Sequence, residues 1–343
     1  MKKLLNVLFV TNPEVFLTLE NENVVAKVGE EKKLSVPLLN LEGIVCFSYF
    51  GATSSLMGEC AKRNITLSFL NDYGKYIGTL YGMTKGNVLL RKEQYRISDD
   101  EKRCLDYAIG FIFGKLHNQR TVIDRAIRDH YLRINIEKLQ DVSTQLKENQ
   151  IQVLKCDNIA KLRAIEGNSA QAYFKVFDEL ILQNKQYFYF ATRNRRPPTD
   201  SVNAMLSLMY TLLMSECRNA LEVVGLDSYV GFMHTDRPGR ASLALDLMEE
   251  LRPQFADRFV LTLINRKEVS DKDFEIQGSG ACLLTRDAKS KILNAWQLKK
   301  KEIITHPFLG EKIEFGLVPY VQALLLSRVI RKNLDNYPPF LWK

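Results

Sequence analysis

The feature that most constrains the fold is a change in residue pattern near residue 96. Before this point, short runs of β-branched and aromatic residues alternate with turn-forming residues, which is typical of β-strands. After it, apolar residues recur at intervals of three and four, as on one face of a helix. The pattern predicts an α+β protein, with a small N-terminal β-rich domain at residues 1–96 and a larger, all-α-helical domain at residues 97–343.

Seven short segments of the first part are expected to be strands, and one segment, residues 53–64, a helix. The strand segments span residues 4–10, 15–21, 23–29, 32–38, 43–50, 65–70 and 78–83. Turn-forming residues at 21–23, 29–30 and 72–74 predict tight turns between strands. In the second part, acidic residues in the first turn predict a helix that begins at Ser98–Glu101.

Composition narrows the class of protein. The net charge of +8 and the isoelectric point near 9.0 favour a polyanionic partner, either a nucleic acid or an anionic membrane surface. The six cysteines form no CxxC pair, so reduced thiols in the cytoplasm are expected rather than disulfides or a zinc ribbon. The opening MKKLLNVLFV resembles a signal peptide, but Asn6 interrupts it and no cleavage site follows. No apolar run approaches the ~20 residues of a membrane span.

The stretch GFMHTDRPGRASLALDLMEELRP, residues 231–253, holds one of four histidines, His234, just before an expected helix at 242–251. Three carboxylates follow at helical spacing: Asp246, Glu249 and Glu250. Residues three and four apart share a helix face, so the acids are expected together, opposite a leucine face that suits a core. They form either a solvated acidic surface or, with the imidazole, ligands for a divalent metal.

Glu166 lies on a face of an expected helix that otherwise carries apolar residues such as Leu162 and Tyr173. A carboxylate on such a face is costly unless it is paired, hydrogen-bonded or bound to a cation. A salt bridge to Arg163 or a helix break at Gly167 would explain it without a metal, and both stay open.

Glu166, His234 and one of Asp246 or Glu249 together form a hard ligand set that suits Mg²⁺ or Mn²⁺. Such an ion polarises a phosphodiester and activates a water or sugar hydroxyl, so a basic chain around it indicates cleavage or transfer of nucleic-acid strands. The segment RNRRPPTD, residues 193–200, breaks the helical pattern and is either a solvated loop or a loop that contacts phosphates.

The motif GFMHTDRPGRASLALDLMEELRP, with AIEGNSAQAYF and RRPPTDSVNAMLSLMYTLL upstream, resembles the CRISPR-associated integrase of spacer acquisition, the metal-dependent nuclease of the adaptation module. YVQALLLSRVIRKNLDNYPPFLWK and NLEGIVCFSYFGATSSLMGECAKRNITLSFL extend the resemblance over nearly the whole chain and favour subtype I-C. The resemblance implies a β-domain that forms a homodimer, and a helical domain that binds Mg²⁺ or Mn²⁺.

By that resemblance the metal ligands are Glu166, His234 and Glu249, and Asp246 is an extra ligand or a residue that supports one. In the family's reaction, a 3′-hydroxyl of a short double-stranded DNA fragment attacks a phosphodiester at a repeat boundary of the CRISPR array, with a small second adaptation protein as partner. Arginines near the motifs are candidate phosphate contacts: Arg193, Arg195, Arg196, Arg237 and Arg240.

Two other functions stay open from the sequence. One is a non-catalytic scaffold that binds nucleic acid and uses the acidic residues for structure, which predicts salt-sensitive DNA binding that ignores divalent ions. The other is a stand-alone nuclease of branched DNA. No membrane partner is expected for either.

Overall fold

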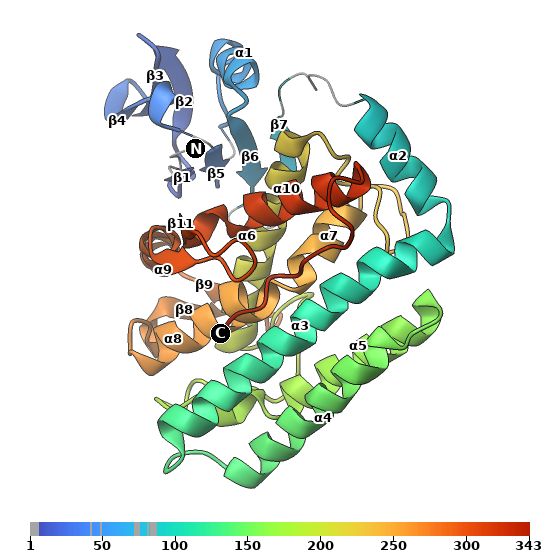
Figure 1. Ribbon diagram of the computed structural model, residues 1–343. Coiled ribbons are helices and arrows are strands. Elements are labelled where there is room, and N and C mark those ends of the chain that lie inside the picture. Colours follow the sequence, from blue (N-terminus) through green and yellow to red (C-terminus); the bar gives the residue numbers. More distant parts are fainter. Residues whose placement is uncertain (1–6, 42, 49, 72–75, 81, 83–87) are drawn as a thin grey trace. The chain divides into compact units, whose positions relative to one another are not determined.

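A computed structural model describes residues 7–41, 43–48, 50–71, 76–80, 82 and 88–343 (Figure 1). Contacts divide the chain into two compact units. Unit 1 comprises residues 1–85, 284–303 and 314–317, and unit 2 comprises residues 86–283, 304–313 and 318–343. The predicted division into domains at residues 96 and 97 stays a prediction. Each compact unit consists of three separate segments of the chain, so no single boundary divides them.

Unit 1 contains two sheets. The first is the antiparallel meander β2-β3-β4, and the second has the order β1-β5-β6-β7, with β1, β5 and β6 parallel and β7 antiparallel to β6. The strands are β1 (Val7–Val10), β2 (Phe16–Glu20), β3 (Asn23–Val28), β4 (Glu31–Pro37), β5 (Gly43–Cys46), β6 (Thr66–Leu70) and β7 (Tyr76–Leu80). Each overlaps an expected strand, while the expected turn at 72–74 lies outside the described residues.

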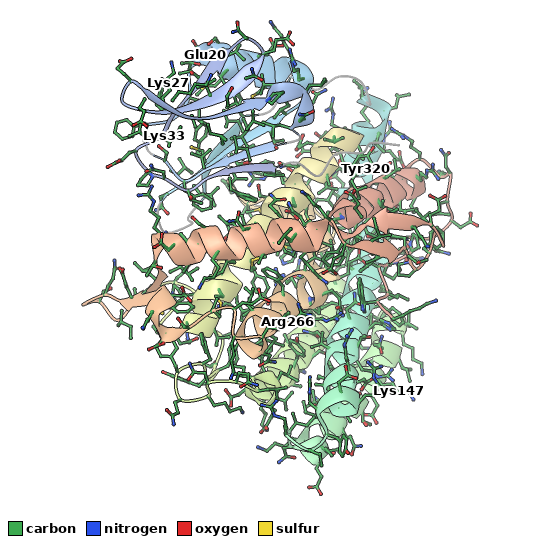
Figure 2. The ribbon with its side chains drawn as sticks, turned by 90° about the vertical axis from the view of Figure 1, so that its left-hand side faces the viewer. Glu20, Lys27, Lys33, Lys147, Arg266 and Tyr320 are labelled. Carbon is green, nitrogen blue, oxygen red and sulfur yellow. The ribbon has the colours of Figure 1, made fainter. Side chains whose placement is uncertain are left out.

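Tight turns join the strands of the meander where the sequence predicts them. Asn21 and Glu22 have φ of 47° and 63°, and Gly29 has φ of 55°, the left-handed backbone that suits short hairpins. On these strands Glu20 and Lys27 form an ion pair of 2.5 Å; both are labelled in Figure 2.

The parallel strands β5 and β6 need a crossover, and α1 (Ser54–Arg63) provides it. Thr53 caps the start of α1, and the left-handed Asn64 ends it, which confirms the helix expected at residues 53–64. Leu56 and Cys60 on its inner face join the buried core of unit 1 with Leu17, Ile44 and other apolar strand residues.

A helix from the far end of the chain completes unit 1. This helix, α9 (Arg286–Lys300), hydrogen-bonds to β1 through Gln297, whose Nε2 lies 3.0 Å from the carbonyl oxygen of Val7. Ser290 lies 3.0 Å from Thr11, oxygen to oxygen. Nothing in the local residue pattern predicts this, because the partners are almost 300 positions apart.

Unit 2 is mainly helical. Its α-helices are α2 (Val88–Ser98), α3 (Glu101–His130), α4 (Ile136–Leu154), α5 (Ile159–Lys175), α6 (Ser201–Val224), α7 (Ser242–Glu249), α8 (Arg258–Asn265) and α10 (Val318–Ile330). A π-helix, η3 (Pro253–Asp257), joins α7 to α8. The 3₁₀ turns in the described part of the chain are η1 (Leu38–Asn40), η2 (Phe177–Leu180), η4 (Asp271–Asp273) and η5 (Phe315–Leu317). Lys147 and Tyr320, labelled in Figure 2, mark α4 and α10.

Side-chain caps fix where the long helices begin. Asp100, Asn135, Asn158 and Asp200 each accept a backbone N–H in the first turn of α3, α4, α5 and α6. Each such cap stabilises a helix by about 1 kcal/mol. The start of α3 matches the expected one, whereas α2 is a helix inside the segment expected to be β-rich.

The predicted α+β class is confirmed, but the region after residue 96 is not entirely helical. It contains four three-residue strands, in two pairs: β8 (Phe274–Ile276) with β9 (Cys282–Leu284), and β10 (Ile303–Thr305) with β11 (Lys312–Glu314). Runs this short show no alternation of apolar and polar residues, so these strands were not predicted from the sequence. No helix of the described residues is both long and apolar enough to cross a membrane.

Candidate active site

Three helices and one loop of unit 2 supply the candidate site. Lys115 comes from α3, Glu166 from α5, Asp246 and Glu249 from α7, and His234 from the loop before α7. Both α5 and α7 contact α3. Residues that are far apart in sequence therefore meet because three helices pack together.

Asp246 holds His234 in place rather than facing an open space. Its Oδ1 lies 2.6 Å from His234 Nδ1 and accepts the His234 backbone N–H at 3.0 Å. Its Oδ2 accepts the backbone N–H groups of Phe232 and Met233 at 2.6 and 3.0 Å. Both oxygens are thus used, and the imidazole keeps Nε2 for another partner.

Two further residues shape this loop. A side chain at Gly231 would press its Cβ to within 2.9 Å of the Asp246 Oδ2, so only glycine lets the backbone wrap the carboxylate. Arg163 on α5 donates to the carbonyl oxygen of Met233 and to Thr235 Oγ1, the latter at 3.2 Å. Arg163 thereby ties the helix of Glu166 to the loop of His234.

Glu166 is half-buried, and an ion pair with a residue other than Arg163 accounts for its position. Arg163 binds the loop, and the helix α5 continues through Gly167 to Lys175 without a break. The carboxylate of Glu166 instead accepts a hydrogen bond from the ammonium of Lys115.

Lys115 also pairs with Glu249. Its Nζ lies 2.7 Å from Glu249 Oε2, and both side chains are 4% exposed. Arg252 Nη2 lies 2.9 Å from the other oxygen, Oε1. Burial alone would raise the pKa of Glu249, but the charges of Arg252 and Lys115 outweigh it and lower the pKa to about 2.

Of the two alternatives for the acidic residues, the solvated surface is wrong, because Asp246, Glu249 and Glu250 are all buried. Nor do the three share one environment. Glu250 faces the C-terminal segment, where it accepts hydrogen bonds from Gln322, Tyr337 and the Phe340 backbone N–H. Burial without a cationic partner raises its pKa to about 7.

The donor set fits a divalent cation, although the described residues hold no group of three His, Cys, Asp or Glu side chains in position to share one. Glu166 and Glu249 converge on a cation, the Lys115 ammonium. His234 Nε2 lies 3.9 Å from Glu249 Oε1. Oε2 of Glu249 is buried, and its partner is the Lys115 ammonium, 2.7 Å away. Carboxylate oxygens and an imidazole nitrogen are suitable ligands for Mg²⁺ or Mn²⁺.

A basic cavity of about 530 Å³ adjoins this cluster. Four arginines and Lys115 are among its lining residues: Arg193, Arg195, Arg196, Arg252 and Lys115. The side chains of Arg195 and Arg196 are exposed. The segment 193–200 is non-helical, as its prolines predict.

Tyr210 organises the two more buried arginines of the cavity. The guanidinium groups of Arg193 and Arg252 each lie 5.2 Å from the centre of its ring, a cation–π arrangement. The Tyr210 hydroxyl donates to Asp257 Oδ1 at 2.6 Å. Burial raises the pKa of Asp257 to about 6, although the Tyr210 hydrogen bond opposes the shift.

Arg237 and Arg240 lie on the loop between His234 and α7, the first exposed and the second half-buried. Lys115, Arg252 and Tyr210 were not predicted from the sequence. A signal for Lys115 was present, because it follows Phe111 and Ile112 at helical spacing and so falls on a buried face of α3.

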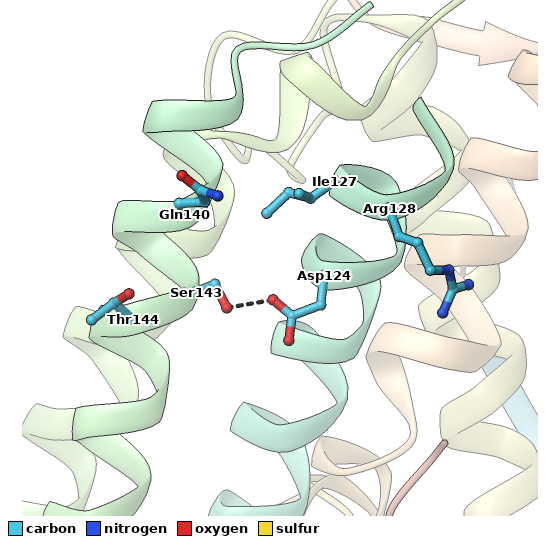
Figure 3. A pocket seen from close by; sticks show the side chains of 6 residues that line it. All are labelled: Asp124, Ile127, Arg128, Gln140, Ser143 and Thr144. Carbon is cyan, nitrogen blue, oxygen red and sulfur yellow. Dashed lines mark hydrogen bonds between the residues drawn. The ribbon is translucent and has the colours of Figure 1, made fainter. Parts of the chain in front are cut away.

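A second hollow, of about 510 Å³, lies between α3 and α4 (Figure 3). Its lining residues are Asp124, Ile127, Arg128, Gln140, Ser143 and Thr144. Ser143 donates a hydrogen bond to Asp124, and Arg120 pairs with the same carboxylate at 3.2 Å. With one carboxylate, already paired, this hollow offers no comparable ligand set.

Known proteins are similar in sequence to this chain over most or all of its length. The family model for the CRISPR associated protein Cas1 matches residues 8–298. A CRISPR-associated endonuclease Cas1 of Chlorobaculum tepidum is 43% identical over 343 residues, which is 100% of both chains. Another, of Rhodospirillum rubrum, is 44% identical over 348 residues, again 100% of both chains.

Solved structures share the fold. A casposase bound to an integration product has a TM-score of 0.84 at 23% identity and covers 99% of this chain and 95% of its own. A Cas1 protein from Thermotoga maritima has a TM-score of 0.80 at 19% identity and covers 95% of this chain and 97% of its own. The family match and the full-length identities show that the chain belongs to the Cas1 family of CRISPR-associated proteins.

Proposed function

We propose that this protein is the metal-dependent endonuclease and integrase of CRISPR adaptation, which inserts short double-stranded DNA fragments into the CRISPR array. The observation that carries the proposal is the convergence of Glu166 and Glu249 on one cation, beside His234. The names of its relatives, CRISPR-associated endonucleases, and the integration product bound to the casposase support the same reaction class.

Glu166, His234 and Glu249 are the proposed ligands of Mg²⁺ or Mn²⁺. Asp246 is the proposed support for His234, since all the contacts of its two oxygens hold the histidine and its loop. When bound, the ion would stabilise charge on the phosphoryl oxygens and promote ionisation of the attacking hydroxyl.

The remaining steps fall to the chain's own groups. Asp246 keeps the proton of His234 on Nδ1, so that Nε2 presents a lone pair. Arg252 holds Glu249 through the oxygen that Lys115 does not contact, and both cations keep the carboxylate ionised. The exposed Arg195 and Arg196 of the cavity, and Arg237 and Arg240 of the loop, are proposed to hold DNA phosphates.

Assembly is also part of the proposal. The β-domain, residues 1–96, is proposed to build a homodimer, and residues 97–343 to form the catalytic domain. The net charge of +8 suits a DNA partner. A small second adaptation protein is the proposed protein partner, in line with Cas1–Cas2 complexes of the same fold.

Joining of a labelled DNA fragment to supercoiled plasmid tests the function. The wild type, Glu166→Ala and Glu249→Ala are compared in Mg²⁺, Mn²⁺ or EDTA, with and without the small partner protein. A fragment that ends in a 3′-dideoxynucleotide is the matched substrate control, because it lacks the attacking hydroxyl. Labelled plasmid is expected only for the wild type, with divalent ion and a free 3′-hydroxyl.

Other outcomes separate the alternatives. Metal-dependent nicking that ignores the 3′ end would identify a nuclease rather than an integrase. DNA binding that depends on salt but not on divalent ions, with no reaction in any protein, would support the scaffold.

A further inference from the structure

Lys115 is a buried cation that two of the proposed metal ligands share. Its ammonium donates to Glu166 Oε1 and lies 2.7 Å from Glu249 Oε2. The side chain is 4% exposed, so water does little to screen these contacts. Without this ammonium, the negative charges of Glu166 on α5 and Glu249 on α7 would repel each other more strongly.

The ammonium and a divalent ion would need the same oxygens. Glu249 Oε2 makes no other directed hydrogen bond among the described residues. Arg252 uses Oε1 of the same carboxylate and leaves Oε2 to Lys115. A cation that takes Glu249 Oε2 together with Glu166 would therefore compete with Lys115.

The structure also offers the displaced side chain a destination. Lys115 lines the basic cavity, together with the exposed Arg195 and Arg196. The lysine side chain is long and flexible, so its ammonium is able to change partners while α3 stays in place. The cavity would have room for an anionic partner, such as the phosphate proposed there.

We propose that Lys115 is an exchangeable counter-ion of the active site. Its ammonium holds Glu166 and Glu249 together when no divalent ion is bound, and it moves into the basic cavity when an ion binds. Lys115 is thus a positioning residue that preserves the ligand geometry and lowers the apparent affinity for the ion. This inference rests on the proposed function.

Binding of Mn²⁺ to the full chain, followed by electron paramagnetic resonance after EDTA treatment and dialysis, tests the exchange. The proteins are the wild type, Lys115→Met and Lys138→Met. The last is a control, because Lys138 pairs with Glu179 at 3.3 Å on the surface. Lys115→Met is expected to bind Mn²⁺ about tenfold more tightly, since a competitor is gone. Its melting temperature without metal is expected to fall, and Lys138→Met to match the wild type.

A measurement on the wild type decides the matter if Lys115→Met does not fold. Lysines are acetylated with and without Mn²⁺, and the modified sites are quantified by mass spectrometry. Acetylation of Lys115 is expected to rise several-fold with Mn²⁺, while that of Lys138 stays constant.

The outcomes separate the inference from the proposed function. If no protein binds Mn²⁺, the metal site and with it the proposed function fail. If the wild type binds Mn²⁺ but Lys115→Met binds equally or more weakly, or Lys115 stays unreactive, the exchange is wrong and the metal site stands.

Discussion

Glu249 and Glu250 are neighbours in sequence, but their surroundings are opposite. Glu249 lies between two cations, Lys115 and Arg252, which lower its pKa to about 2. Glu250 is equally buried but meets only neutral donors, and burial raises its pKa to about 7. One carboxylate is held as an anion by two cations, while the other joins the end of α7 to the C-terminal segment.

The difference shows that burial does not decide the role of an acidic residue; its partners do. On a helix, consecutive side chains point about 100° apart, so Glu249 and Glu250 reach different elements. Gly114 on α3 leaves room for the Glu250 side chain, because a Cβ at this position would lie 2.9 Å from Glu250 Cβ.

Replacing each glutamate with glutamine should separate their roles. Glu249→Gln is expected to lower strand transfer roughly 10²–10³-fold, because a proposed metal ligand loses its negative charge. Glu250→Gln is expected to keep most of the wild-type rate. Initial rates on labelled fragment and plasmid measure both, and comparable losses would show that the contrast is not functional.

The pH dependence of stability should separate them as well. The pKa of Glu250 rises from 4.5 to about 7 on folding, so the unfolded chain releases a proton that the folded protein keeps. Stability should therefore fall by about 3 kcal/mol between pH 4.5 and 7 from this group, and the buried Asp257 should act likewise. The contribution of Glu249 has the opposite sign: it is present above pH 4.5 and lost as the pH falls toward 2.

Urea unfolding at a series of pH values measures this dependence. Glu250→Gln should reduce the dependence of the free energy of unfolding on pH between pH 4.5 and 7. Any stability that the amide itself costs should not change with pH. An unchanged slope would mean that Glu250 is ionised in the folded protein at the lower pH.

Asp246 gives a third environment on the same helix. Asp246→Asn is expected to lower strand transfer roughly 10–100-fold, because His234 loses the carboxylate that sets its tautomer. The control is Asp124→Asn, in the hollow between α3 and α4, which should leave the rate unchanged. A loss as large as that of Glu249→Gln would make Asp246 a ligand itself.

The smallest expected effect is that of Tyr337→Phe, which removes one hydrogen bond to Glu250. A loss of about 1–3 kcal/mol of stability is expected, with the rate of strand transfer retained. Thermal unfolding and plasmid joining measure the two quantities, and Tyr320→Phe on α10 serves as the control. A loss of activity at unchanged stability would tie the C-terminal segment to catalysis.

Much of the local structure was predictable because its causes are local. Strand runs between turn residues located the meander, and Asp100 and Thr53 capped helices where the sequence expected them. The resemblance led to the Cas1 family, whereas subtype I-C stays a prediction. Asp246, Glu249 and Glu250 were expected to share one helix face. Each meets different partners instead, because protein surrounds α7.

The amino-acid sequence was enough to predict the α+β class, the family and a short set of candidate residues around Glu166, His234 and Glu249. The class follows from periodicity and capping, which act over a few residues at a time, whereas the family and the choice of Glu249 follow from the resemblance. Only the tertiary structure decided that Asp246 serves His234, that Lys115 joins Glu166 to Glu249, and that Glu250 turns away. The physical reason is that the state of a buried charge depends on the groups that packing brings to it, from helices far apart in the chain.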